Sequence, residues 1–73
     1  MTPEQCKMAR AGLGLGVREL ADMAKVSTNT ITRFERGEPL MERTLDAIRA
    51  ALESGGVEFT NADRPGVRLK PKG

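Results

Sequence analysis

Hydrophobic residues recur at helical spacing over the first 54 residues of the chain, and beyond residue 56 they alternate with polar ones. The helical spacing predicts four helices, over about residues 3–11, 17–24, 28–36 and 42–54. Local start and stop signals agree with these bounds. Thr2 and Pro3 are typical of a helix start, Ser27 is a good N-cap, and Gly37 suits the position just after a helix. The sequence therefore predicts a mainly α domain of four helices over residues 1–54.

The alternating segments are Val57-Glu58-Phe59-Thr60 and Val67-Arg68-Leu69-Lys70. They predict a short C-terminal β-hairpin within residues 55–73, followed by a basic, solvated tail. A lone hairpin is marginal in water, so it must pack on the helices or on another molecule. We expect it to be the dimerisation element of a homodimer, and the alternative is that it only covers its own helices. The residues expected to make the dimer contact share one face: Val57, Phe59, Val67 and Leu69.

The predicted helix 28–36 has one polar and one largely apolar face. The polar arc holds Thr28, Asn29, Thr32, Arg33 and Arg36. By itself this pattern is common in surface helices that simply face water. The neighbouring sequence changes the interpretation, because only three residues, Lys25-Val26-Ser27, connect this helix to the preceding one. A connection this short forces a steep crossing and leaves the second helix prominent on the surface, as in proteins that insert a helix into DNA.

This stretch resembles the helix-turn-helix of Cro/C1-type (XRE family) regulators, which include the lambdoid phage repressors. The residues that carry the resemblance are Leu20-Ala21, Val26-Ser27, Ile31 and Phe34-Glu35-Arg36-Gly37, and it covers about residues 3–54. It implies a lambda-repressor-like fold with the helix-turn-helix over 17–37 and the recognition helix over 28–36. It also implies an ion pair between Arg10 and Glu35. The outward residues that would reach base edges are Thr28, Asn29, Thr32 and Arg33.

The resemblance implies a bacterial or phage-encoded transcriptional regulator, expected to be a repressor, that binds a palindromic double-stranded DNA operator as a homodimer. Recognition helices would lie about 34 Å apart on successive major-groove faces. Asn29 suits adenine, Arg33 suits guanine, and the two threonines suit thymine methyl groups. The groups expected to contact phosphate are Arg18, Lys25, Ser27, Arg36 and Arg43.

Charge and local sequence predict modest backbone binding. Residues 1–60 carry eight basic and nine acidic side chains, and the net charge of +2 comes from the C-terminal segment. The loop after the third helix is acidic where family members are often basic. Gly16 and Val17 replace the polar residue and glutamine that often begin the second helix. A protein-binding helix-turn-helix module with little DNA affinity, such as an anti-activator or antirepressor, therefore stays open as an alternative.

Other classes of function lack the residues they need. The chain has one cysteine and no histidine, so we expect no metal site, no cofactor and no nucleophile–base pair for an enzyme. The glycines of 12–16 follow no strand and match no phosphate-binding motif. Neither a membrane-spanning run nor a signal peptide is evident, so we expect a cytoplasmic, nucleoid-associated protein. No small-molecule ligand is implied.

Overall fold

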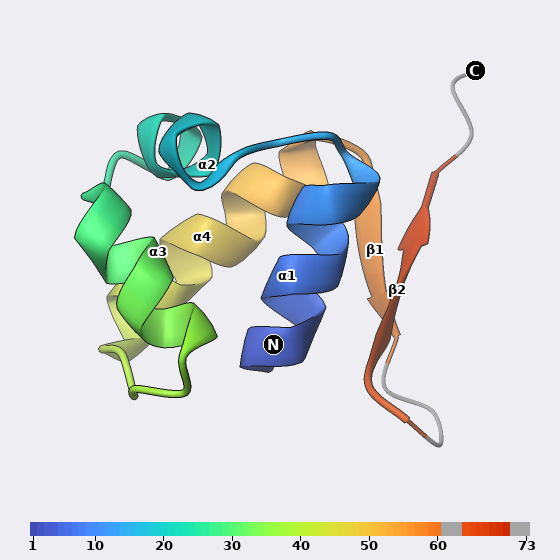
Figure 1. Ribbon diagram of the computed structural model, residues 1–73. Helices are drawn as coiled ribbons and strands as arrows, with labels where there is room; N and C mark the ends of the chain where they lie inside the picture. Colours follow the sequence, from blue (N-terminus) through green and yellow to red (C-terminus); the bar gives the residue numbers. More distant parts are fainter. Residues whose placement is uncertain (61–63, 71–73) are drawn as a thin grey trace.

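The computed structural model describes residues 1–60 and 64–70. These residues form four helices and one two-stranded antiparallel sheet (Figure 1): α1 (Pro3–Gly12), α2 (Val17–Ala24), α3 (Thr28–Glu35), α4 (Glu42–Ser54), β1 (Val57–Thr60) and β2 (Gly66–Leu69). The predicted mainly α class with a small hairpin is confirmed at this level. Most of the predicted turn between the strands and the end of the predicted basic tail, residues 61–63 and 71–73, lie outside the described residues. Within the described part, no helix is long and apolar enough to cross a membrane.

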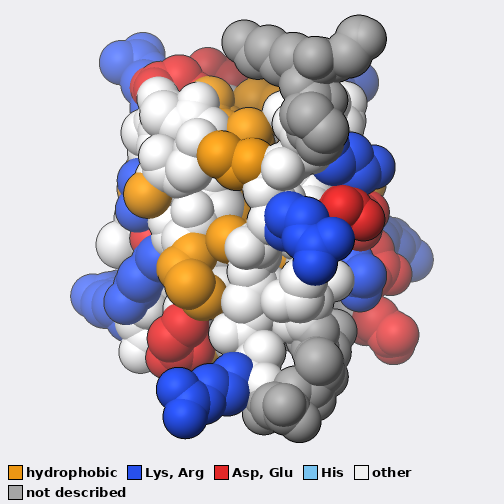
Figure 2. All heavy atoms as spheres, turned by 90° about the vertical axis from the view of Figure 1, so that its right-hand side faces the viewer, with side chains coloured by type: hydrophobic (Ala, Val, Ile, Leu, Met, Phe, Trp, Pro, Cys, Tyr) orange, Lys and Arg blue, Asp and Glu red, His pale blue; other side chains and the backbone are white. Residues whose placement is uncertain are grey.

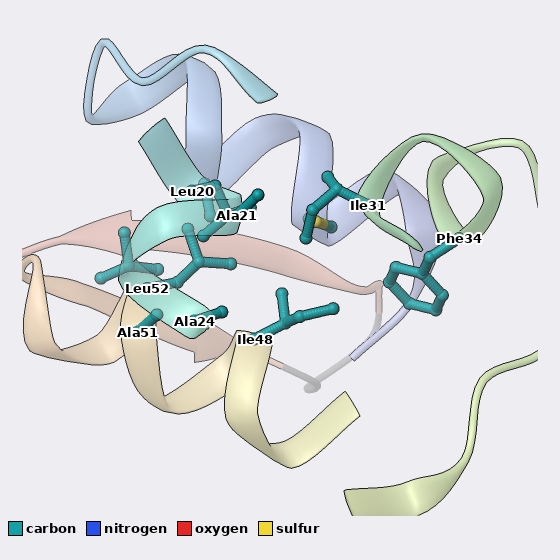
Figure 3. Packing of buried hydrophobic residues seen from close by; sticks show 11 residues of the cluster. Leu20, Ala21, Ala24, Ile31, Phe34, Ile48, Ala51 and Leu52 are labelled. Atoms are coloured by element: carbon teal, nitrogen blue, oxygen red, sulfur yellow. The ribbon is translucent and has the colours of Figure 1, made fainter. Parts of the chain in front are cut away.

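The core lies where α2, α3 and α4 converge (Figure 3). Leu20, Ile31, Ile48 and Leu52 are completely buried there. Ala21 is also buried, and its small side chain lets α2 and α3 pack closely. Leu45 of α4 is partly buried and packs against this cluster. Cys6 and Ala9 of α1 belong to the same buried cluster, so side chains of all three other helices pack behind α3.

The hairpin packs beside α1 and α4, on the opposite side of the molecule from α3 (Figure 1). Val57 pairs with Leu69 and Phe59 with Val67, so all four apolar side chains share one face, as predicted. A buried side chain of α1 also hydrogen-bonds to the hairpin. The Gln5 amide nitrogen donates to the carbonyl oxygens of Thr60, at 3.2 Å, and Gly66, at 3.0 Å.

The short connection from α2 to α3 depends on one left-handed residue. Lys25 ends α2 with φ of 59°, a conformation that costs a residue with a side chain roughly 1 kcal/mol. Its conformation allows the Val26 N–H to donate to the Ala21 carbonyl, at 3.0 Å. The Ser27 hydroxyl then accepts the Thr30 N–H at 3.1 Å and starts α3. The predicted tight connection is thus present. Lys25 occupies a left-handed position that glycine would adopt at lower steric cost.

Candidate nucleic-acid interface

The outward face of α3 is open to solvent. Thr28, Asn29, Thr32 and Arg33 are all exposed, and so is Arg36 at the end of the helix. The opposite face is buried through Ile31, Phe34 and Glu35. Sequence periodicity predicted this division into a polar and a buried face. The exposed face of α3 presents hydroxyl, amide and guanidinium groups side by side.

Local hydrogen bonds decide which groups on this face remain available. The Thr32 hydroxyl donates to the Thr28 carbonyl at 3.0 Å, so its proton is engaged, while its oxygen can still accept and its methyl group remains exposed for an outside contact. The Ser27 hydroxyl caps α3 and also lies 2.8 Å from the Thr30 hydroxyl. Ser27, predicted to contact phosphate, is therefore engaged within its own helix start. Asn29 forms no hydrogen bond with another described side chain.

An acidic residue that the sequence analysis noted only as part of an acidic loop contacts the predicted interface directly. The Glu38 carboxylate accepts from Arg33 Nε at 3.0 Å and from Arg36 Nη2 at 3.4 Å. Two cations expected to contact DNA thus share one counter-charge. The spacing of two arginines and a glutamate around Gly37 was visible in the sequence, but only the turn of the chain brings the three groups together.

The other predicted phosphate contacts are dispersed. Arg18, Lys25 and Arg43 are exposed on α2, at its end and on α4, and none forms an ion pair among the described residues. Where α2 begins, the Gly16 N–H already donates to the Glu19 carboxylate at 2.8 Å. A phosphate at that helix start would have to compete with a negative side chain.

The start of α4 is different. No side chain caps this helix at Met41, so its first N–H groups have no side-chain acceptor. A hollow of about 390 Å³ lies there, lined by residues of α3, of the loop and of α4 that include Arg33, Glu38 and Thr44. Backbone N–H groups of this kind favour anions. Arg43 lies in the same first turn of α4, consistent with the phosphate role expected for it.

An ion pair fastens α3 to α1 beneath this face. Glu35 accepts from Arg10 Nε and Nη2, both at 2.9 Å, so the predicted pair forms with two hydrogen bonds. The hydrogen bond to Glu35 raises the pKa of Arg10. The buried Cys6 thiol also donates to Glu35, at 3.4 Å, and burial followed by this hydrogen bond raises the pKa of the thiol to about 12. Cys6 is thus a neutral core residue, and no cluster of metal-binding side chains occurs among the described residues.

The predicted dimer contact needs one correction. Val57 is completely buried in the core of its own chain, so its side chain is not available to a second molecule. Phe59 and Val67 are partly buried against the same core, and the Arg49 guanidinium lies 5.5 Å from the centre of the Phe59 ring. Leu69 alone of the four is exposed, at 49%. The reason is that α1 and α4 offer the hairpin an apolar surface within its own chain.

The exposed side of the hairpin has a mixed surface. Figure 2 shows hydrophobic side chains in a broken band down this face, with basic groups on both sides of it.

Comparison of the sequence with models of known protein families gives no match, and comparison with curated proteins gives none either.

Proposed function

We propose that this protein is a sequence-specific DNA-binding transcriptional regulator with a Cro/C1-type helix-turn-helix, in which α3 enters the major groove. One observation carries the proposal: α3 exposes an uninterrupted polar face while its opposite face is buried. A helix held in this way can approach base edges without unfolding any part of its own chain.

Thr28, Asn29, Thr32 and Arg33 are the proposed base-reading groups. An asparagine amide matches adenine, a guanidinium matches guanine, and the Thr32 methyl matches the thymine methyl. Each good contact discriminates against a wrong base by roughly 1–3 kcal/mol. The Arg10–Glu35 pair supports this function indirectly, because it holds α3 at a fixed angle to α1.

The proposed assembly is a homodimer that pairs through the outer edge of β2. The Lys70 N–H donates to the Gly56 carbonyl at 2.7 Å, which makes these two residues a hydrogen-bonded pair. Antiparallel ladders alternate, so the pairs Val57–Leu69 and Phe59–Val67 are non-hydrogen-bonded, and their backbone groups face outward. Leu69 is exposed at this edge. Because α3 lies on the far side of the molecule, such a dimer leaves both recognition helices accessible (Figure 1).

Two observations favour a second candidate, a protein-binding module with little DNA affinity. Glu38 offsets part of the positive charge at α3, and Glu19 occupies the start of α2. Both weaken attraction to phosphate, which supplies most non-specific DNA affinity.

Selection of bound duplexes from a random DNA pool tests the two candidates directly. A DNA-binding regulator enriches a two-fold symmetric sequence, and fluorescence anisotropy then shows binding that weakens as salt rises. Lack of any enriched sequence, together with lack of salt-sensitive binding, would reject the DNA-binding proposal in favour of the protein partner.

A further inference from the structure

The turn that ends α3 places Glu38 beside Arg33. Gly37 has φ of +102° and reverses the chain. Its N–H donates to the Phe34 carbonyl at 2.9 Å, and the Glu38 N–H donates to the Arg33 carbonyl at 3.1 Å. These two bonds are the pair that defines a Schellman helix end. The backbone of Glu38 is therefore tied to the backbone of the residue whose guanidinium its side chain also contacts.

The contact involves a specific part of the guanidinium. Glu38 Oε1 accepts from Arg33 Nε at 3.0 Å. Neither Nη nitrogen of Arg33 has a partner among the described residues. The Nη edge is the part left to donate two parallel hydrogen bonds to guanine O6 and N7. A guanidinium whose Nε is anchored also loses less rotational freedom when it binds a base.

We propose that Glu38 is a specificity-determining positioning residue: it orients Arg33 toward a guanine and keeps Arg36 from binding phosphate indiscriminately. The second effect follows from the same carboxylate, because its other oxygen lies 3.4 Å from Arg36 Nη2. Glu38 thereby lowers the total affinity for DNA and raises the discrimination between sequences, since phosphate contacts add affinity without sequence information. This inference rests on the proposed DNA-binding function.

The test compares three single variants of the whole chain. Glu38→Ala removes both contacts. Glu38→Gln makes the same change in charge but keeps a carbonyl oxygen that can accept from Arg33 Nε. Glu42→Ala is the matched control, because Glu42 is an exposed acid that forms no ion pair among the described residues. The DNA probes are the duplex that the unaltered protein selects, that duplex with each guanine replaced in turn, and a scrambled duplex of equal composition.

We expect Glu38→Ala to bind the scrambled duplex more tightly and with a steeper salt dependence. Its preference for one particular guanine should fall roughly two- to fivefold, the range that an exposed ion pair supports. Glu38→Gln should keep more of that preference, and Glu42→Ala should keep all of it. If Glu38→Ala and Glu42→Ala retain equal preference for every guanine, Glu38 acts through charge alone and the inference is overturned. If the unaltered protein selects no sequence at all, the proposed function fails, and the inference fails with it.

Discussion

Arg10 and Glu35 lie 25 positions apart in the sequence and are joined by two hydrogen bonds of equal length, 2.9 Å each. The Glu35 side chain is only 9% exposed. Arg10 also donates from Nη1 to the Leu15 carbonyl at 3.2 Å, so one guanidinium ties together α1, α3 and the loop before α2. The exposed face of α3 owes its orientation to this contact and to the core beneath it.

Removal of one partner of this pair should be costly. Arg10→Met leaves the Glu35 carboxylate buried without its cation, and we expect the free energy of unfolding to fall by about 3 kcal/mol. The double variant Arg10→Met/Glu35→Leu should recover most of that loss, because it leaves no buried charge. Urea unfolding followed by circular dichroism measures both. A single variant as stable as the unaltered protein would show that the pair is not coupled to folding.

Alkaline pH should destabilise the protein through Cys6. The folded thiol has its pKa raised to about 12, from an ordinary value of 9.0. Between these pH values the unfolded chain releases the thiol proton while the folded chain retains it. The contribution of Cys6 to the free energy of unfolding is therefore fully present below about pH 9. Between pH 9 and about 12 it falls by about 1.4 kcal/mol per pH unit.

Cys6→Ser supplies the control for this slope, because serine can donate to Glu35 and does not titrate in the range. Urea midpoints measured from pH 8 to 11 should decline less steeply for Cys6→Ser than for the unaltered protein. Tyrosine and histidine are absent from the sequence, so neither contributes to the difference. Parallel declines in the two proteins would refute this role for the thiol.

The hairpin should loosen when Gln5 loses its donor. In the unaltered protein the Thr2 N–H donates to Gln5 Oε1 at 2.8 Å, and Gln5→Glu keeps an oxygen for that bond. The variant also places a carboxylate oxygen, in place of the amide N–H donor, against the carbonyl oxygens of Thr60 and Gly66. We expect a loss of at least about 1–3 kcal/mol, the cost of an unsatisfied buried group. Amide hydrogen exchange should quicken in β1 and β2. Thr2→Val, which removes only the cap, should affect α1 and leave the hairpin amides protected.

Arg33→Ala should weaken binding to the selected duplex by roughly tenfold or more, the value of a good base contact. Binding to scrambled DNA should fall much less. Arg49→Ala removes the same charge from α4, where the guanidinium lies over the Phe59 ring of the hairpin, and serves as the control. Equal losses on both duplexes would make Arg33 a phosphate ligand, and no loss on either would remove it from the interface.

Leu69→Pro should separate the proposed dimer into monomers. Proline removes an N–H that faces the outer edge of β2, and it leaves the hydrogen bonds between β1 and β2 in place. Leu69→Ala also removes most of the leucine side chain but keeps the N–H. Multi-angle light scattering should show the proline variant as a monomer and the alanine variant as a dimer. A dimer in both cases would place the interface elsewhere.

Much of the architecture follows from local rules. Helical periodicity with its caps predicted α2 and α4 with their observed bounds and the other two helices within about a turn. Two alternating segments predicted the hairpin and its shared apolar face. The inward and outward residues of α3 were also predictable, because a regular helix turns by a fixed angle for each residue.

The contacts between elements followed no such rule. Val57 was predicted to contact a partner molecule but lies in its own core, since alternation identifies a face but not what covers it. The Gln5 amide hydrogen-bonds to the hairpin more than 50 positions away, at Thr60 and Gly66, and no local pattern in α1 indicates that contact. Glu38 looked like one acid in a loop until the turn at Gly37 placed it against Arg33. Sequence alone determined which residues form helices and strands and which face of α3 is polar, because these depend on neighbours along the chain. Only the tertiary structure decided which charges meet and which apolar side chains remain exposed, because those depend on groups brought together from distant parts of the sequence.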